Sequence, residues 1–301
     1  MKMSSPLFHR RQRGLTLVEV MVGLALGLIV VGAILSTYLT VARSQVTQLG
    51  ESQLSQNSGS AMGFIGSAVR DAGLTVPDTN WNDFNQDLRV QPPGGTFDLF
   101  GARNKNPSAG NKPWPSIQMI TSGGVSTLVV RREIDPDNSA DLDCLGRPYP
   151  KVAGGRAWGI VECRFNFDTT KRDLTVQAVG LASPITAAAP LVPAGTLFDY
   201  QIRTAQQPAG NFYSATPVRG DISYFDATDA TDWPLVVGVE LCLVLASPTD
   251  PAARPTSYTR CDGSTATAPT TGPAYAFRIV RSTFQLRNRS AVMPFLNPDP
   301  A

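Results

Sequence analysis

Residues 15–42 read LTLVEVMVGLALGLIVVGAILSTYLTVA. From Val20 to Ala42 no residue is charged, and the run is long enough for about 35 Å of α-helix. A helix of that length can cross a hydrocarbon core of about 30 Å. The sequence therefore predicts a membrane-spanning helix at 15–42. The basic HRRQRG before it places the N-terminus in the cytoplasm by the positive-inside rule.

A carboxylate, Glu19, stands near the start of this apolar stretch. A secretory signal peptide would have a shorter apolar core that ends in an A-x-A-like cleavage site, so the stretch does not fit one. A plain signal anchor explains the length and the orientation but not the acid. An acid inside a bilayer costs about 2.5–3.5 kcal/mol on insertion scales, and such a residue usually has a partner.

The run Arg13-Gly14-Leu15-Thr16-Leu17-Val18-Glu19 resembles the class III signal peptide of type IV prepilins. The resemblance implies that residues 1–14 are a leader peptide, which the prepilin peptidase removes by cutting between Gly14 and Leu15. It also implies N-methylation of Leu15 after the cut. Most members of that family have phenylalanine where this chain has Leu15.

Cleavage would give Glu19 a partner. The new α-amino group of Leu15 would be cationic, and Glu19 on an adjacent, staggered helix can neutralise it. Removing one member of a buried pair typically costs about 3–5 kcal/mol, so such a pair would set the axial register between subunits. In the alternative, Glu19 lies at the level of the lipid headgroups and faces water.

The helix is predicted to continue beyond the membrane, over residues 15–74. Apolar residues recur at steps of three and four between residues 46 and 72, no proline occurs between Leu15 and Leu74, and Gly73 is a plausible stop. Such a long helix cannot bury its own apolar face. We expect the globular head to cover the second half of the helix and neighbouring subunits to cover the first half.

Residues 75–301 are predicted to form a β-rich periplasmic head. Residues 76–120 are rich in Pro, Asn, Gly and Asp and indicate irregular loops with few strands. The predicted fold class is α+β, type IV pilin-like, with a long N-terminal helix packed on an antiparallel head. Six strand-like runs lie between Pro/Gly-rich connections: Thr127–Arg131, Trp158–Phe167, Leu174–Val179, Gly220–Phe225, Val236–Leu245 and Tyr275–Leu286.

Four cysteines in the second half of the chain, Cys144, Cys163, Cys242 and Cys261, predict disulfides made in an oxidising compartment. The first two and the last two are each 19 residues apart, which favours the local pairs Cys144–Cys163 and Cys242–Cys261 over the other connectivities. Each pair would close a loop of about 20 residues and contribute roughly 3 kcal/mol. No C-x-x-C occurs, so a zinc ribbon or a thioredoxin-like redox site has no support.

The composition excludes several chemistries. The only histidine, His9, precedes the predicted cut, so the mature chain would lack the histidine of Ser-His-Asp or Cys-His catalysis and of many metal sites. Four of the 26 basic residues also precede Gly14, which leaves 22 basic against 24 acidic residues and gives no reason to expect nucleic acid. We expect no enzymatic activity, no cofactor and no metal.

Two patterns in the head could suggest ligands. The run DPDNSADLD at 135–143 superficially resembles a calcium loop, but Ala140 and Gly146 stand where that loop has its glycine and its final glutamate. A solvated acidic loop is the better interpretation. Tryptophans can form a sugar-stacking platform, although they more often pack in cores. The four tryptophans are Trp81, Trp114, Trp158 and Trp233.

Several short stretches further resemble PilW-type minor pilins. The resemblance implies a low-abundance subunit that acts with other minor pilins to prime assembly of a type IV pilus, near its tip, in motility, adhesion or DNA uptake. Its partners would be the major pilin, the prepilin peptidase and the assembly platform of the inner membrane, where the precursor is anchored before it enters the fibre. The stretches are Gln56-Asn57, Phe64-Ile65, Val69-Arg70-Asp71-Ala72-Gly73, Asp143-Cys144-Leu145-Gly146, Arg278-Ile279-Val280 and Leu286-Arg287-Asn288.

Two alternatives stay open. A pseudopilin of a type II secretion system shares the same kind of leader, so the sequence hardly separates it from a pilin. A tip adhesin would use the head to bind a host ligand or a sugar.

Overall fold

The structure is a computed structural model of the 301-residue chain. It divides into two compact units, residues 1–49 and residues 50–301, and each is described here by itself. The described residues are 16–75, 105–106, 112–113, 115–135, 141–148, 159–180, 188–206, 223–228, 233 and 236–286.

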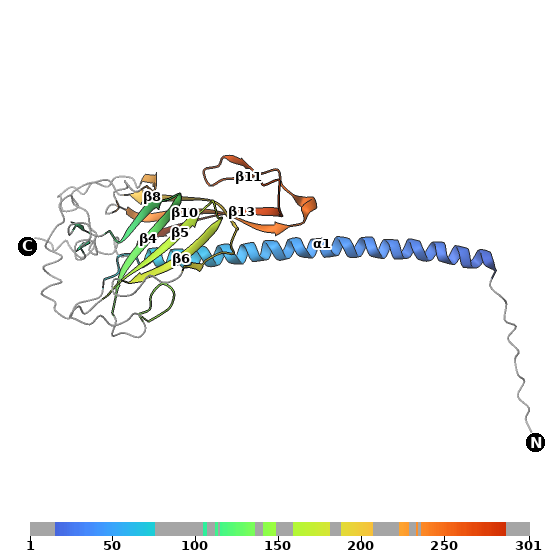
Figure 1. Cartoon of the computed structure of the whole chain (residues 1–301), viewed down its shortest axis with the longest axis horizontal. Coiled ribbons are helices and arrows are strands. Elements are labelled where there is room, and N and C mark those ends of the chain that lie inside the picture. Colours follow the sequence, from blue (N-terminus) through green and yellow to red (C-terminus); the bar gives the residue numbers. More distant parts are fainter. Residues whose placement is uncertain are drawn as a thin grey trace, which may run out of the picture. The chain divides into compact units, whose positions relative to one another are not determined.

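One helix, α1 (Leu17–Arg70), begins in the first unit (Figure 1). The hydroxyl of Thr16 accepts the N–H of Glu19 at 3.3 Å and so satisfies one of the free donors at the helix start. Up to Leu49 the helix exposes all of its large apolar side chains. The most apolar stretch of this helix is not buried, and by length and composition the helix can cross a membrane.

The second unit includes the remaining turns of α1, and there one face of the helix is buried. This burial follows the apolar spacing seen in the sequence. The buried residues of this face are Gly50, Leu54, Ser58, Ala61, Met62, Ile65, Gly66 and Val69.

The helix ends at Arg70, a few residues before the predicted end at residue 74. The N–H of Ala72 bonds to the carbonyl of Val69 at 3.2 Å, a tightened last turn. Gly73 then adopts a φ of 74°, which favours glycine, and donates its N–H to the carbonyl of Arg131 at 2.8 Å. This bond carries the chain from the helix onto the first sheet.

A five-stranded antiparallel sheet follows, with its strands in chain order. Gly123 and Gly124, with φ of 60° and 81°, form the two-residue turn between its first two strands, as a type I′ hairpin requires. The first strand of this sheet begins at Ile117, near the end of the stretch 76–120 for which few strands were predicted. The strands are β3 (Ile117–Ser122), β4 (Val125–Ile134), β5 (Gly159–Asp168), β6 (Asp173–Gly180) and β7 (Ala189–Pro190).

A four-stranded antiparallel sheet has the order β13-β10-β8-β9. Its strand β8 was not predicted, because Asp199, Gln201 and Arg203 make the run look like a polar connection; such residues are depleted in strands. The other three strands match predicted runs. The bounds are β8 (Leu197–Gln206), β9 (Ser223–Asp226), β10 (Val236–Thr249) and β13 (Ala274–Gln285).

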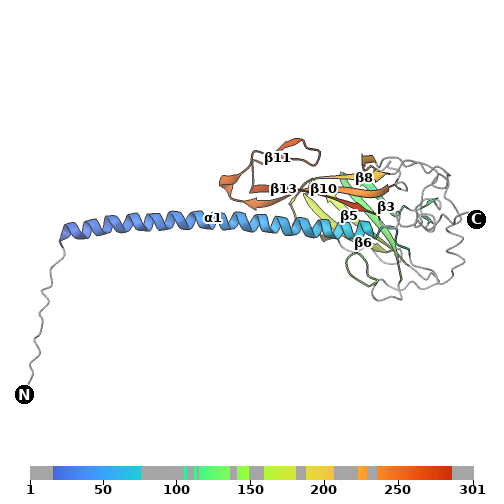
Figure 2. The same ribbon diagram turned by 180° about the vertical axis from the view of Figure 1, so that it is seen from behind.

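The inner faces of both sheets and the buried face of α1 share one hydrophobic core. Phe64 of α1 meets Phe165 of β5 edge-on, with ring centroids 6.2 Å apart. Phe167 of β5 stacks on Tyr200 of β8 at 4.9 Å, which joins the two sheets. Both views place the turns of α1 after Gly50 beside the sheets (Figures 1 and 2). The predicted α+β fold, one long helix with antiparallel sheets, is confirmed.

Three small elements complete the described chain. The strands β1 (Lys105–Asn106) and β2 (Lys112–Pro113) form a short hairpin. A single 3-10 turn, η3 (Pro251–Ala253), follows β10 and is capped by Asp250. A second hairpin pairs β11 (Ser257–Thr259) with β12 (Thr265–Thr267).

Candidate assembly surface and disulfide-held loops

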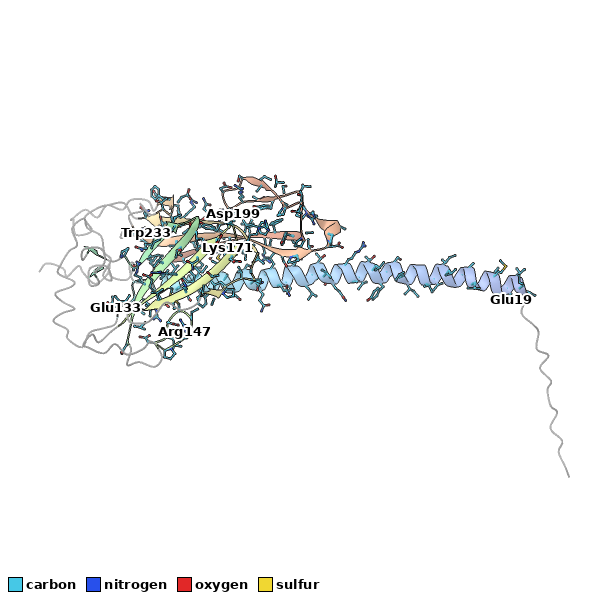
Figure 3. All side chains as sticks on the ribbon, in the orientation of Figure 1. Glu19, Glu133, Arg147, Lys171, Asp199 and Trp233 are labelled. Carbon is cyan, nitrogen blue, oxygen red and sulfur yellow. A yellow bond between two sulfur atoms is a disulfide. The ribbon has the colours of Figure 1, made fainter. Side chains whose placement is uncertain are left out.

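The predicted cleavage site, Gly14 and Leu15, lies outside the described residues. Glu19 lies in the first turn of α1, at the end of the helix that bears the N-terminus (Figure 3). Its side chain is exposed within its own unit. A carboxylate in the first turn interacts favourably with the positive end of the helix dipole.

The first part of α1 presents a long apolar surface. Soluble monomers rarely expose contiguous apolar patches larger than a few hundred Å², so lipid or other chains are expected to cover it. The most exposed of its large side chains are Leu17 at 77%, Leu28 and Ile29 at 68%, Val18 and Tyr38 at 67%, and Ile34 at 64%.

Residues 9–35 match the family model described as the prokaryotic N-terminal methylation motif. The chain carries that prepilin-like motif. The match spans Glu19, the predicted cut and the start of α1, and the motif belongs to pilin-like structural proteins and not to an enzyme family. It fits an anchor in the membrane and assembly with other subunits of the same kind.

One solved structure that resembles the chain is the type IV-like pilin TTHA1219 from Thermus thermophilus. The two share 9% sequence identity, and the similarity covers 58% of this chain and 85% of that chain with a TM-score of 0.33. That score is too low to add to what the helix and strands themselves establish. No curated protein sequence matches the chain.

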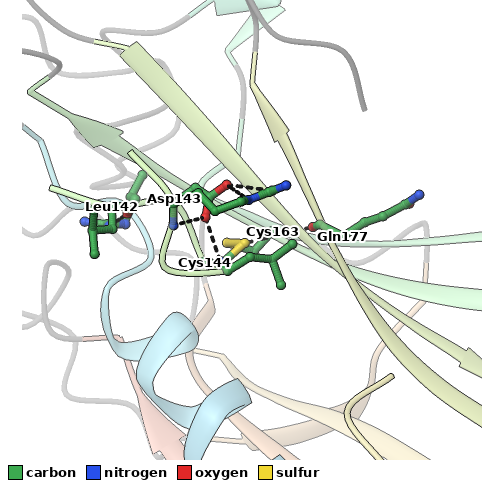
Figure 4. Close-up of polar contacts among 8 residues, drawn as sticks. Leu142, Asp143, Cys144, Cys163 and Gln177 are labelled. Atoms are coloured by element: carbon green, nitrogen blue, oxygen red, sulfur yellow. Dashed lines mark hydrogen bonds and ion pairs between the residues drawn. A yellow bond between two sulfur atoms is a disulfide. The ribbon is translucent and has the colours of Figure 1, made fainter. Parts of the chain in front are cut away.

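The structure joins Cys144 to Cys163, with Cα atoms 6.0 Å apart, and this bond ties the loop 141–148 to strand β5 (Figure 4). Asp143 organises the loop. Its carboxylate accepts the N–H groups of Leu145 at 2.8 Å and Arg147 at 2.9 Å, and the guanidinium of Arg147 lies 2.7 Å from it. The stretch around Cys144 that resembles PilW-type pilins is thus a closed turn held by one carboxylate and one disulfide.

The second disulfide, Cys242–Cys261, holds a flap that we define as residues 250–273. The Cα atoms of the two cysteines are 5.8 Å apart, and Cys242 lies on β10. Asp199 accepts the N–H of Cys261 at 2.9 Å, and Arg281 donates to its carbonyl at 2.6 Å. Strands β8, β10 and β13 therefore each make one contact with the flap at Cys261.

A second, smaller core lies beneath the flap. Tyr258 of the flap stacks on Phe277 of β13 with centroids 4.5 Å apart, and Phe198 of β8 meets Phe277 edge-on at 4.9 Å. The guanidinium of Arg172 lies 4.2 Å from the centre of the Phe198 ring. This aromatic cluster was not predicted, because its members come from separate parts of the sequence.

The flap is also fixed at its own turns. Arg254 donates to the carbonyls of Pro269 at 3.1 Å and Thr270 at 2.6 Å. At the tip, the hydroxyl and N–H of Ser264 bond to Asp262 and lower the pKa of that carboxyl. These contacts fix the turns of the flap, in addition to the aromatic cluster beneath it.

An ion cluster that the sequence analysis missed lies on the outer face of the five-stranded sheet. The guanidinium of Arg131 on β4 donates to Glu162 on β5 at 2.6 Å, and their side chains are only 3% and 6% exposed. Arg131 also donates to the carbonyl of Pro115 at 2.8 Å, and Arg164 approaches the other oxygen of Glu162. Such a pair cannot be foreseen from residues 31 positions apart in the sequence.

Two carboxylates of the acidic run at 135–143, those of Asp141 and Asp143, have partners among the described residues. Asp141 accepts the N–H of Asp135 at 2.9 Å and lies 3.9 Å from Arg132, while Asp143 is engaged by Arg147. Within the described part of the chain no group of three or more acidic or cysteine side chains could hold a metal ion.

The possible tryptophan platform gains no support. Trp233 is 5% exposed and belongs to the main core, so it is not available to stack on a sugar. Trp81, Trp114 and Trp158 lie outside the described residues.

Proposed function

We propose that this chain is a minor pilin of PilW type, made as a precursor that is cut after Gly14 and methylated on Leu15. It lies in the inner membrane with a periplasmic head and then enters the fibre, where it helps to start assembly near the tip. Its partners are the major pilin, other minor pilins, the prepilin peptidase and the assembly platform.

One observation carries this proposal. The methylation motif at residues 9–35 leads into a helix whose large apolar side chains are exposed up to Leu49 and whose face is buried only from Gly50 on. A polymerising subunit needs such a division, because the first part must be covered by lipid before assembly and by neighbouring helices afterwards. The head must hold the second part in a fixed orientation.

The register between subunits is assigned to Glu19. The amino group of Leu15 on one subunit would meet the carboxylate of Glu19 on the next, so that two charges poorly tolerated by lipid form one pair. The exposed position of Glu19 in the first helical turn leaves it available for this contact.

N-terminal mass analysis of the protein extracted from membranes tests the proposal. We expect the mature chain to begin at Leu15 and to carry one methyl group on its amine. A functional product that still begins at Met1 would contradict it. Because a type II secretion pseudopilin would be processed in the same way, a deletion strain is needed as well: loss of twitching motility supports a pilin, and loss of protein secretion supports a pseudopilin.

A further inference from the structure

Strand β13 forms one border of the four-stranded sheet, and no described strand pairs with its outer side (Figure 2). It is 12 residues long. The border strands β9, β3 and β7 of the two larger sheets have only 4, 6 and 2 residues. Proteins usually keep such borders short, because unpaired backbone N–H and C=O groups invite another strand. β13 is longer than such border strands usually are.

The strand is also regular. It pairs with β10 without a shift from Gly238↔Gln285 to Thr249↔Ala274. The other neighbour of β10, β8, has two shifts in its pairing. β13 contains neither proline nor glycine, so it lacks the bulges and breaks that commonly block an edge. Another strand could therefore pair with β13 along its whole length without a break in register.

The side chains of β13 suit cross-strand packing. Tyr275, Phe277 and Ile279 alternate along the face that also carries the flap. The first two join the aromatic contacts beneath the flap, and Ile279 is 42% exposed. Aromatic or β-branched residues on a neighbouring strand pack well against such side chains.

The charges of β13 select the kind of strand that can be added. Arg278 and Arg281 are its only charged residues. Arg278 is exposed, and its side chain forms no hydrogen bond or ion pair with any described residue. The side chain of Arg281 is 51% exposed and lies 3.5 Å from Glu240.

This pattern disfavours a second copy of the chain. Two β13 strands aligned antiparallel over their full length would place Arg278 opposite Arg281 at two positions, and like charges directly opposite each other destabilise a ladder. An extended segment with carboxylates at these positions would be stabilised instead.

We propose that the open edge of β13 binds an extended segment of a different polypeptide, which adds a strand to the sheet and places two carboxylates, three residues apart, opposite Arg278 and Arg281. Backbone hydrogen bonds supply the affinity and the two arginines supply the selectivity. The inference does not depend on the assignment to a pilus.

Hydrogen exchange on the full-length chain in detergent gives the first test. In the free protein, alternate amides of β13, those that point away from β10, should exchange rapidly because they have no partner. If all amides of β13 are already protected, or if the chain forms a dimer that protects them, the edge is not open to another polypeptide and the proposal fails.

Binding of synthetic peptides gives the second test. We would use a set of peptides of about ten residues that alternate Val and Thr and carry two Asp residues three positions apart, and the same set with Lys in place of Asp. Fluorescence anisotropy with the full-length chain should show saturable binding of Asp peptides only, together with slower exchange in β13. Failure of every Asp peptide to bind would overturn the proposal.

A charge swap locates the site. Arg278→Glu should weaken binding of the Asp peptides by about fivefold and give the Lys peptides measurable binding. Lys171→Glu makes the same change of charge at a side chain that is 76% exposed on the β5–β6 turn, and it should leave both affinities unchanged. Equal binding to the wild type and to Arg278→Glu, or protection outside β13, would refute the assignment.

Discussion

The ring of Phe284 occupies the space in which a Cβ atom on Gly66 would lie. An ideal Cβ there would be 2.3 Å from one ring carbon and within 2.9 Å of two more. The same helix carries Gly63, where an added Cβ meets nothing within 4 Å. The glycine at 66 therefore permits the close approach of α1 and β13, whereas the one at 63 is not needed for packing against any described residue.

Gly66→Ala should lower the free energy of unfolding of the head by about 1–3 kcal/mol, because the Phe284 ring must leave its position. Gly63→Ala is the matched control and should stabilise the helix by up to about 1 kcal/mol, since alanine favours helix and the site is open. Denaturant unfolding of the full chain in detergent, followed by tryptophan fluorescence, measures both. Equal effects of the two substitutions would contradict the packing described for Gly66.

The ion pair between Arg131 and Glu162 should be costly to break. Glu162→Gln removes the charge of Glu162 from beside the nearly buried guanidinium of Arg131, and we expect a loss of about 3–5 kcal/mol in the free energy of unfolding. Lys171→Gln removes an exposed pair with Asp168, 3.7 Å apart, and should cost less than about 1 kcal/mol. A loss at Glu162 no larger than that at Lys171 would show that the cluster is solvated.

Each disulfide should protect its own loop from trypsin. With Cys242 and Cys261 both changed to Ala, we expect faster cleavage at Arg260 in the flap and unchanged cleavage at Arg147. With Cys144 and Cys163 both changed, the pattern should reverse. Each double variant should lose about 2–4 kcal/mol of stability. Peptide mapping without reduction must also find these two pairs, and any crossed pair would contradict the connectivity.

Processing should depend on Gly14. The variant Gly14→Ala is expected to stay at precursor length and to be absent from fibres, because the resemblance assigns this glycine to the peptidase site. Immunoblots of membranes and of sheared fibres measure both properties. Normal processing of the variant would refute the assigned cut.

Assembly should depend on Glu19 after processing. Glu19→Gln keeps the size of the side chain and removes its charge, so we expect normal cleavage and methylation but little protein in sheared fibres. The control Glu51→Gln, at an exposed position on the same helix, should enter fibres normally. Normal incorporation of Glu19→Gln would show that the carboxylate does not pair with the amine of Leu15.

The sequence predicts the fold where its signals are local. The uncharged run from Val20 to Ala42 and the apolar spacing beyond it predict α1, since a helix repeats every few residues. Apolar strands such as β5 and β10 were predicted for the same reason. Strand β8 was missed because its charged outer face is explained only by neighbours from distant parts of the chain, among them Cys261 and Glu240.

The candidate site divides in the same way. The methylation motif is continuous in the sequence, so the cleavage position and Glu19 could be predicted without a structure. The Arg131–Glu162 pair and the aromatic contacts beneath the flap depend on the order of strands in two sheets, which no local pattern encodes. That no described strand pairs with the outer side of β13 likewise follows from the sheet order and not from the residues of β13 alone.

The division of α1 at Gly50 has a practical consequence for anyone who wishes to crystallise the head. A soluble fragment that began after the helix, near residue 75, would leave a trough in the head where Leu54, Ala61, Ile65 and Val69 belong, and it should aggregate. A fragment that began shortly before Gly50 would keep these side chains and would lack the exposed apolar part of α1. The turns of α1 after Gly50 are therefore an integral part of the hydrophobic core of the head.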